Sequence, residues 1–395
     1  MRTLGLDVHK RFTEVAVHEG GELRSLGRVE TRPEQLRLLA QSLGRDDHVV
    51  IESTSLAWPV AALFAEHAGT VTVSNPLRTR AIASAKVKTD KVDARTLAEL
   101  AAAGVLAKVW APDEPTRALR RRNAHRARLV RQRTRLRNQV HALLVRNLVA
   151  VEVSDLFGKR GRRLLAELTL PVDERAQLDS TLRLHDALCE EIATCERPLA
   201  QHALDSPEVR RLMTIPGVGA ITALAIVGVI GDIRRFPSQR QLVGYLGLDP
   251  RVRQSGERPA RHGHISRQGQ AHARGLLVEA AWSAIKTPGP LRAFYLRLRQ
   301  RRGSQIAIVA TARKLAVLSW QLLTKDEDCR YTPPVRLERK LQELERQAGI
   351  TTNRTTIRKA TERRADEREL LNRAQHDYEQ QIADRLNCRP GPGGT

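Results

Sequence analysis

The sequence predicts an α/β domain with a mixed sheet, a long basic helical connector, and a mainly helical second domain. Three observations predict this organisation. Apolar runs and helical periodicity alternate up to Pro112, and residues 117–146 then contain eleven arginines and no acidic residue. Beyond them, a glycine-rich turn opens an apolar helix at 220–230. A chain of 395 residues is long enough for two domains and a connector.

The first predicted domain spans residues 1–112. An apolar strand at 2–8 is followed by two alternating strands joined at Gly20-Gly21, which indicates an antiparallel meander. The remaining predicted elements are a helix from Pro33, a buried strand at 48–52, a helix at 58–67, a strand at 70–74 and a helix at 91–103. Asn75-Pro76 is expected to interrupt the pattern before that last helix. The order β-β-β-α-β-α-β predicts a mixed sheet.

The rest of the chain is predicted to be largely helical. Residues 113–205 form the connector, in which an arginine-rich helix with a thin apolar stripe is followed by a return helix, as in a hairpin or coiled coil. Residues 206–325 form the second domain. Residues 326–388 form a charged extension whose heptad-like pattern favours an oligomerisation or RNA-contacting helix, and 389–395 form a disordered tail.

The composition favours a polyanionic partner. Lysine and arginine outnumber aspartate and glutamate by 67 to 44, for a formal charge of +23. Only 3% of residues are aromatic, which favours phosphate contacts over base stacking and therefore duplex or structured nucleic acid. The longest apparent apolar stretch, 220–230, is shorter than the ~20 residues of a membrane span, and no signal peptide is recognisable. We therefore expect a cytoplasmic protein with no membrane partner.

The cysteines do not predict a metal or disulfide site. Their spacing lacks C-x-x-C pairs, and their density is too low for a disulfide scaffold. We expect reduced bystanders at the four positions Cys189, Cys195, Cys329 and Cys388.

Four acidic residues are candidates for a divalent-metal site. Asp7 and Glu52 follow apolar strands, at the sheet edge where α/β domains usually place their chemistry. Asp90 and Asp93 share a face if their segment is helical. Converging carboxylates suit Mg²⁺, and two ions about 3.5–4 Å apart can assist phosphoryl transfer. Taken singly, an aspartate after a strand is more often a turn or cap residue, and surface charges at a helix start also explain Asp90 and Asp93.

In combination, these residues resemble a known family. The stretches Gly-Leu-Asp-Val-His-Lys at 5–10 and Lys-Thr-Asp-Lys-Val-Asp-Ala at 88–94 are similar to those of the DEDD transposases of bacterial insertion sequences, the IS-one-ten family. The resemblance covers about residues 1–325. It implies a ribonuclease H-like, RuvC-like first domain with Asp7, Glu52, Asp90 and Asp93 as catalytic metal ligands, and a carboxyl-terminal transposase domain.

The same resemblance extends to the second domain through Gln254-Ser255-Gly256, through the motif at 263–269, and through flanking stretches at 245–250 and 276–282. It implies that Ser255 is the nucleophile that becomes covalently joined to a DNA end. The residues alone indicate only a loop serine, which would need a base or metal for activation. The family usually has lysine where this chain has Arg267, which keeps the positive charge.

Other residues are predicted to contact nucleic acid. The segment 215–219, Ile-Pro-Gly-Val-Gly, is similar to a helix-hairpin-helix element, in which Gly217 and Gly219 would let backbone N–H groups approach a phosphate; a plain turn between packed helices is the alternative. Ser266 is expected to be a phosphate contact or a helix N-cap. The arginines predicted to bind phosphates are Arg120, Arg121, Arg122, Arg126, Arg128, Arg131, Arg133, Arg135, Arg137, Arg258, Arg261, Arg267 and Arg274.

The sequence thus predicts a transposase, or recombinase, that mobilises an insertion sequence with two Mg²⁺ ions and Ser255. Double-stranded DNA is the predicted substrate. The resemblance implies a structured guide RNA and a homo-oligomer, a dimer or tetramer, in which one subunit lends its serine to another's metal site. Two alternatives remain: a RuvC-like endonuclease in which water attacks, and a non-catalytic nucleic-acid-binding protein.

Overall fold

The computed structural model describes residues 2–82, 89–256, 258–350 and 359–387. The chain divides into two compact units, Met1–Pro112 and Asp113–Thr395, which we call unit 1 and unit 2. The predicted tail at 389–395 and Cys388 lie outside the described residues.

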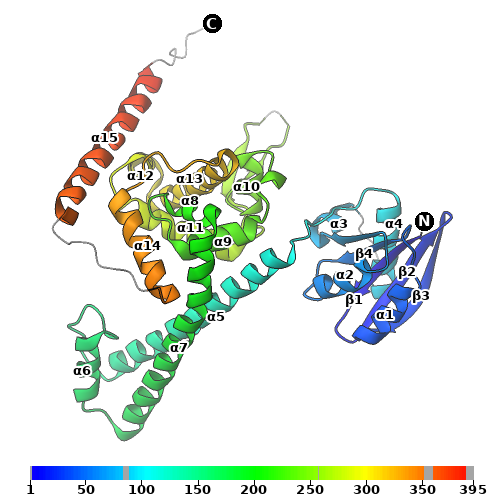
Figure 1. Cartoon of the computed structure of the whole chain (residues 1–395), viewed down its shortest axis with the longest axis horizontal. Helices are drawn as coiled ribbons and strands as arrows, with labels where there is room; N and C mark the ends of the chain where they lie inside the picture. The colour runs from blue at the N-terminus through cyan, green and yellow to red at the C-terminus, as the bar shows by residue number, and fades with distance from the viewer. Residues whose placement is uncertain (1, 83–88, 257, 351–358, 388–395) are drawn as a thin grey trace. The chain divides into compact units, whose positions relative to one another are not determined.

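Unit 1 is built on a five-stranded mixed sheet with strand order β3-β2-β1-β4-β5 (Figure 1). The strands β1, β2 and β3 pair antiparallel, whereas β4 pairs parallel to both β1 and β5. Their bounds are β1 (Thr3–Val8), β2 (Phe12–Glu19), β3 (Glu22–Glu30), β4 (His48–Glu52) and β5 (Thr70–Ser74). The helices are α1 (Pro33–Gln41), α2 (Ala57–Ala65), α3 (Pro76–Ile82) and α4 (Asp90–Ala102). The predicted order β-β-β-α-β-α-β is therefore confirmed, and so is a helix over most of 91–103.

Unit 1 contains one helix that was not predicted. Asn75-Pro76 interrupts the pattern as expected, since β5 ends at Ser74, but the chain then starts α3 at Pro76. The Asn75 side-chain oxygen accepts hydrogen bonds from the backbone N–H groups of Leu77 and Arg78, at 3.1 and 3.3 Å. Proline is well suited to the first helical position, where its missing N–H is not needed. The dipeptide therefore caps a helix.

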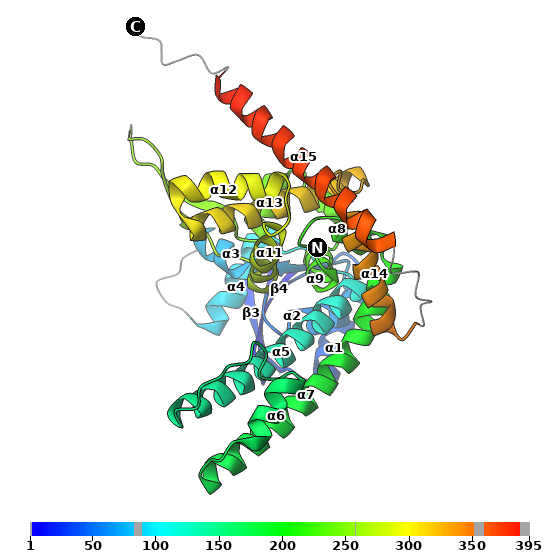
Figure 2. The same cartoon turned by 90° about the vertical axis from the view of Figure 1, so that its left-hand side faces the viewer.

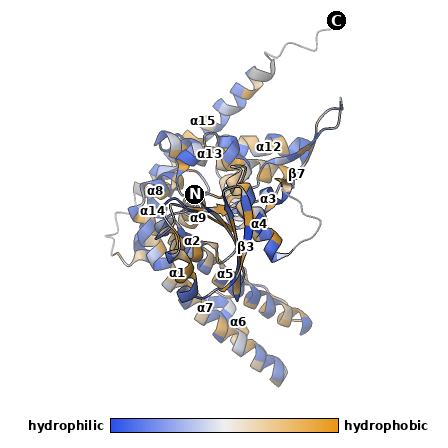
Figure 3. Ribbon diagram, turned by 90° about the vertical axis from the view of Figure 1, so that its right-hand side faces the viewer, coloured by the Kyte–Doolittle hydropathy of each residue, from blue (hydrophilic) through white to orange (hydrophobic). Residues whose placement is uncertain are grey.

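Unit 2 begins with a helical hairpin. The basic helix α5 (Glu114–Arg146) and α7 (Val172–Asp205) pack along each other, with α6 (Lys159–Glu167) between them in sequence (Figure 2). Arg126 pairs with Glu196, and Arg146 pairs with Glu174. Because one residue number rises while its partner's falls, the two helices are antiparallel. Both show hydrophilic and hydrophobic residues interleaved along their length (Figure 3).

The rest of unit 2 packs around a second apolar core. This part comprises α8 (Pro207–Met213), α9 (Ala220–Ile230), a short 3₁₀ helix at Ile233–Arg235, α10 (Gln239–Tyr245), the strands β6 (Pro250–Arg253) and β7 (Arg261–Ile265), α11 (Ala271–Ala284), α12 (Pro290–Arg302) and α13 (Ser304–Lys325). Leu119 of α5 and Leu199 of α7 lie in the same core. The hairpin is therefore rooted in the domain that follows it.

The extension contributes two helices, α14 (Pro334–Ala348) and α15 (Lys359–Asn387). Helix α14 packs on α7, and its Leu344 is part of the core. Helix α15 packs on α12 and α14, and the buried carboxylate of Glu367 accepts a hydrogen bond from the Val335 backbone N–H at 2.7 Å. Both helices are thus packed against the rest of unit 2.

Helix α13 is a longer, mainly apolar segment that was not singled out from the sequence, and Arg313-Lys314 interrupts it. It has the length and hydropathy of a membrane span, and half of the relevant window is buried inside unit 2. The buried residues Leu315, Ala316 and Leu322 belong to the core. A core helix of a globular domain passes the same test, so the composition of α13 is explained by packing.

Candidate metal centre and nucleic-acid interface

Two of the predicted acidic residues lie at the carboxyl ends of adjacent parallel strands. Leu6 of β1 lies opposite Ile51 of β4, so the next residues, Asp7 and Glu52, are neighbours at the same sheet edge. Asp7 is buried, with 5% of its surface exposed, whereas Glu52 is half-buried. This is the edge at which the sequence predicted chemistry.

The other two acidic residues reach this edge because α4 lies very close to β1. A Cβ atom on Gly5 would be 2.0 Å from the Ala94 carbonyl oxygen and 2.7 Å from the Ala98 nitrogen. Only glycine allows this approach. Since Gly5 and Asp7 are two residues apart on a strand, they face the same side of the sheet. The close contact therefore places the first turn of α4, which contains Asp90 and Asp93, beside Asp7.

Asp7, His9 and Asp90 form a compact cluster. The His9 Nε2 atom lies 3.0 Å from Asp7 Oδ2 and 3.3 Å from Asp90 Oδ1, and the three ligand atoms lie within 4.8 Å of one another. Thr89 caps α4 by accepting a hydrogen bond from the Val92 N–H at 3.3 Å, which fixes this turn. Among the described residues, Glu52 and Asp93 contribute no atom to this group.

Burial and neighbouring carboxylates disfavour the charged form of Asp7 in this cluster. Burial raises the pKa of Asp7, and the charges of Asp90 and Asp93 raise it further, while the hydrogen bond from His9 acts in the opposite direction. Burial lowers the pKa of His9, but its hydrogen bond to Asp7 and the nearby carboxylates outweigh burial and raise it overall. The carboxylate oxygens suit a hard divalent ion.

Sequence reasoning missed two residues of this face. His9 follows Asp7 at a spacing of two, which on an extended chain directs both side chains to one side. Glu14 lies opposite Asp7 on β2 and is buried, but Arg28 donates to its carboxylate at 2.8 Å. The charge of Glu14 is therefore already neutralised by Arg28. The Asp-x-His spacing could have predicted that His9 lies beside Asp7.

Ser255 lies in unit 2, in the connection between β6 and β7. The residue is exposed and precedes Gly256, whose φ of 57° is in the left-handed region. In the part of unit 2 that the structure describes, no hydrogen bond to the Ser255 hydroxyl is present. The carboxylate cluster belongs to unit 1, so each half of the predicted chemistry sits in a different unit.

Ser266 has a structural partner at the base of the same hairpin. Its hydroxyl donates to Asp249 Oδ1 at 2.6 Å, and its N–H donates to the Asp249 carbonyl oxygen at 2.8 Å. The N-cap of α11 is Gln270, so the expected N-cap role of Ser266 was wrong. These two bonds tie the end of β7 to the start of β6.

The predicted helix-hairpin-helix segment connects α8 to α9. Gly217 has a φ of 84°, and a Cβ there would be 2.4 Å from the Ala280 carbonyl oxygen of α11. Close helix packing therefore explains Gly217. Gly219 is the N-cap of α9, and a Cβ there would meet no atom within 4 Å. Of the two glycines, only Gly219 has open space beside its backbone.

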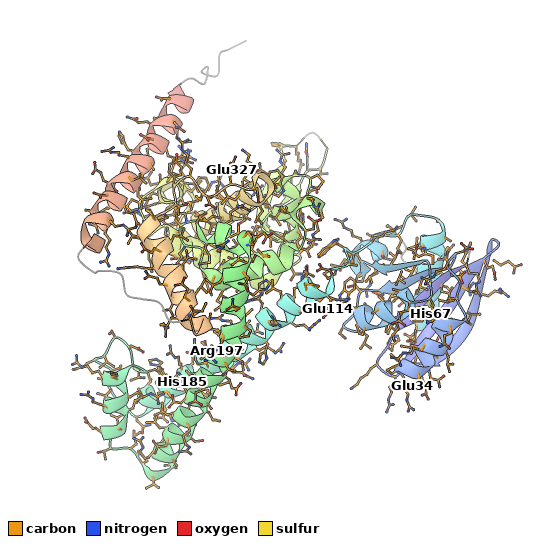
Figure 4. The ribbon with its side chains drawn as sticks, viewed as in Figure 1. Glu34, His67, Glu114, His185, Arg197 and Glu327 are labelled. Carbon is orange, nitrogen blue, oxygen red and sulfur yellow. The ribbon has the colours of Figure 1, made fainter. Side chains whose placement is uncertain are left out.

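Several arginines of α5 are engaged within the protein. Arg120 donates to the carbonyl oxygens of Gly228 and Val229 at the end of α9, at 2.6 and 2.9 Å. Arg126 is paired with Glu196. Arg137 lies over the Phe157 ring, 4.6 Å from its centroid, and donates to His185 at 3.3 Å. Figure 4 labels His185 on α7. These contacts explain the three arginines structurally.

Four other arginines of α5 are exposed to solvent. We call Arg121, Arg128, Arg131 and Arg135 the arginine stripe; their spacings of seven, three and four residues keep them on one side of a helix. Arg121 also pairs with Glu114 at the start of α5 (Figure 4). Of the other predicted contacts in α5, Arg122 is exposed and Arg133 is half-buried.

The predicted arginines near the hairpin also differ in exposure. Arg258, Arg261 and Arg267 are exposed, and Arg267 has a φ of 57°. Arg274 is half-buried and donates to the Leu246 carbonyl oxygen at 3.1 Å. The first three are free to face a ligand, whereas Arg274 joins α11 to the turn after α10.

The mixed sheet, with acidic residues at the ends of β1 and β4 and on the following α4, defines a ribonuclease H-like domain of the kind found in nucleic-acid-processing enzymes. Comparison with protein families agrees. Residues 4–147 match the DEDD transposase model of the IS110 type, and residues 209–296 match the model described as Transposase IS116/IS110/IS902 family. The chain belongs to this family of transposases, enzymes that cut and rejoin DNA.

Three bacterial relatives illustrate the similarity. A probable family 20 transposase of Pseudomonas aeruginosa is 32% identical over 62% of this chain and 74% of the relative. The transposase for insertion sequence element IS1111A of Coxiella burnetii is 32% identical over 62% of this chain and 68% of its own length. The putative transposase y4qE of Sinorhizobium fredii is 30% identical over 81% of this chain and 87% of its own length.

Proposed function

We propose that this transposase cuts, exchanges and rejoins DNA strands with a metal-dependent RuvC-like domain and a serine nucleophile, Ser255. The observation that carries the proposal is the cluster of Asp7, His9 and Asp90, beside which Glu52 ends the neighbouring parallel strand. The proposed ligands of the metal are Asp7, Glu52, Asp90 and Asp93. The donor set is consistent with Mg²⁺, and we propose two ions.

The bound metal would polarise the scissile phosphate and stabilise the leaving oxygen. The protein's own contribution is to hold the carboxylates in place: β1 and β4 fix Asp7 and Glu52, while the Gly5 contact fixes α4. Rigid elements on both sides of the cluster favour a preorganised centre.

In the proposed joining step, Ser255 Oγ bonds to the phosphorus of the target phosphodiester as the bond to the leaving sugar oxygen breaks. The hydroxyl proton passes to solvent or to a base, and the leaving oxygen takes up a proton in turn. The exposure of Ser255 supports this role because a DNA backbone can reach it. Attack by a second DNA hydroxyl reverses the reaction and restores the phosphodiester.

Nucleic acid is proposed to bind along the basic surfaces of unit 2. The arginine stripe and the exposed Arg258, Arg261 and Arg267 supply positive charge for phosphates. Gly219 offers open backbone at the start of α9. We propose double-stranded DNA as substrate and a structured guide RNA as a further partner, with a homo-oligomer as the active form. The net charge of +23 is consistent with both polyanions.

The first test concerns the metal ligands. Asp7→Asn keeps the side-chain size but removes a ligand charge, so Mg²⁺-dependent cleavage of element-end DNA should fall by at least about 10²-fold, as for other lost transition-state contacts. Asp46→Asn, at an exposed position of unit 1, should retain activity. Full cleavage by Asp7→Asn would contradict the enzymatic proposal. So would a wild-type protein that binds every element-end substrate but cleaves none of them in a metal-dependent way.

The second test concerns the nucleophile. With wild-type protein, denaturing gels should trap DNA covalently attached to the chain, and Ser255→Ala should abolish that product. Ser266→Ala is the matched control, because Ser266 is bonded to Asp249, and it should retain the covalent product. If Ser255→Ala still cleaves at the wild-type rate and no covalent product forms with either protein, the water-using endonuclease is correct.

A further inference from the structure

We propose that His9 is a direct ligand of the metal ion held by Asp7 and Asp90, and that its nitrogen shifts the preference of this site toward Mn²⁺ over Mg²⁺. The inference rests on the proposed metal-dependent function and adds to it a ligand and a metal selectivity. His9 was not among the metal ligands predicted from the sequence.

The distances fit ligands around a single ion. Two ligand atoms at right angles around an ion, each ~2.1 Å from it, are ~3.0 Å apart. The His9 Nε2 atom lies 3.0 Å from Asp7 Oδ2 and 3.3 Å from Asp90 Oδ1. The same nitrogen therefore faces both carboxylates at the separation that shared coordination requires.

The imidazole is held in this orientation by its neighbours. The His9 backbone N–H donates to the Phe12 carbonyl oxygen at 2.9 Å, and the two rings lie with their centroids 5.0 Å apart. Arg28 lies 4.3 Å from the centroid of the Phe12 ring and is anchored to Glu14. The His9 side chain is still 42% exposed. The nitrogen is thus preorganised, and solvent ions can reach it.

The ligand type decides the selectivity. Mg²⁺ strongly prefers oxygen ligands and retains its waters, so a nitrogen ligand gives it little. Affinity for a mixed nitrogen and oxygen site increases along the first transition series from Mn²⁺ onward. A site of carboxylates alone would discriminate less between Mn²⁺ and Mg²⁺. His9 therefore gives Mn²⁺ an advantage that carboxylates do not.

The test uses Mn²⁺ bound to the full-length protein and a spectroscopic signal that requires no DNA. Pulsed electron paramagnetic resonance of the wild type should show ¹⁴N hyperfine coupling from a coordinated imidazole, and His9→Gln should lose it. Glutamine can still donate a hydrogen bond to the carboxylates, so it separates ligation from mere positioning. His18→Gln is the control, because His18 lies opposite Thr3 at the far end of β1, and it should retain the coupling.

Binding provides the second measurement. His9→Gln should weaken Mn²⁺ binding by about tenfold, the lower end for disturbed metal sites, while the Mg²⁺ affinity, measured by competition, changes less. The proposal is overturned if wild-type protein shows no ¹⁴N coupling, if the coupling persists in His9→Gln, or if both metals weaken equally. If the wild type cleaves DNA with Mg²⁺ but shows no ¹⁴N coupling, only the proposal that His9 is a metal ligand is overturned. If it shows ¹⁴N coupling but cleaves no DNA, the proposed function is overturned instead.

Discussion

At the scale of single residues, two positions show how small groups set the geometry of a whole unit. Gly5 allows α4 to lie directly on β1, and Lys340 of α14 joins the extension to the turn between α8 and α9. The Lys340 Nζ donates to the carbonyl oxygens of Met213 and Val218 at 2.8 and 2.6 Å. Neither role is visible in hydrophobic periodicity, because both depend on what approaches the residue from elsewhere in the chain.

Gly5→Ala should displace α4 and disrupt the carboxylate cluster. The new Cβ would lie 2.0 Å from the Ala94 carbonyl oxygen, and such overpacking costs about 1–3 kcal/mol. We expect a lower unfolding midpoint for unit 1 and weaker Mn²⁺ binding. Gly44→Ala is the matched control, since its Cβ would meet only the Asp47 carboxylate at 4.0 Å. Wild-type stability and metal binding in Gly5→Ala would refute this account of the α4 contact.

Lys340 predicts a pH dependence of stability. Burial lowers its pKa from 10.5 to about 8. Between these values the folded chain has released a proton that the unfolded chain still binds, so the free energy of unfolding should rise with pH in this window, by about 1–3 kcal/mol. Denaturant unfolding of unit 2 at pH 8, 9 and 10 measures this. Lys340→Met should flatten the rise, and exposed Lys325→Met should not; an equal slope in both variants would contradict the prediction.

At the scale of elements, the arginines of α5 divide into two sets. Arg120, Arg126 and Arg137 are engaged, and their contacts with α9, α7 and Phe157 hold the hairpin together. The exposed set is the arginine stripe. The sequence does not distinguish the engaged arginines of α5 from the exposed ones. Only packing against α7 and α9 does.

Substituting arginines of the arginine stripe should weaken nucleic-acid binding without affecting stability. Replacing Arg128, Arg131 and Arg135 together with glutamine removes three exposed charges, so the slope of log K against log salt for duplex DNA should become shallower by about 3. The unfolding midpoint should not change. Arg120→Gln is the contrasting variant: it should destabilise unit 2 by about 1–3 kcal/mol, because the Gly228 carbonyl oxygen loses its Arg120 donor and that of Val229 keeps only Arg235. An unchanged salt slope in the triple variant would rule out the stripe as a DNA contact.

At the scale of the whole molecule, the two proposed halves of the reaction lie in different units. The metal ligands belong to Met1–Pro112 and Ser255 to Asp113–Thr395. A homo-oligomer in which subunits share a site would bring serine and metal together across copies. The C-terminal extension is also part of unit 2, since Leu344 lies in the core and Lys340 fixes the glycine turn.

Mixing two inactive variants tests this sharing. Asp7→Asn and Ser255→Ala each lack one half of the chemistry, so an equimolar mixture should recover about a quarter or more of wild-type strand exchange if subunits complement one another. Size-exclusion chromatography with light scattering verifies that the variants assemble as the wild type does. Mixed oligomers that form normally yet stay inactive would show that each chain uses its own serine and metal site.

The sequence by itself determined the order β-β-β-α-β-α-β of unit 1 and the positions of Asp7 and Glu52 at strand ends. Local periodicity and residues such as Asp7 at a strand end are properties of neighbouring residues, so they can be predicted from short segments. It also identified α5 as a basic helix, because charge is additive along the chain. The family resemblance added Ser255, which no local pattern distinguishes from an ordinary loop serine.

Only the tertiary structure decided which of these residues meet. His9 joins Asp7 and Asp90 because α4, more than eighty residues away in sequence, packs against Gly5. Arg120 is structural because the end of α9 lies beside it, and α13 is a core helix because other helices cover it. The physical reason is common to all three: burial, close approach and hydrogen-bond partners depend on segments distant in sequence, and short-range patterns contain no information about them.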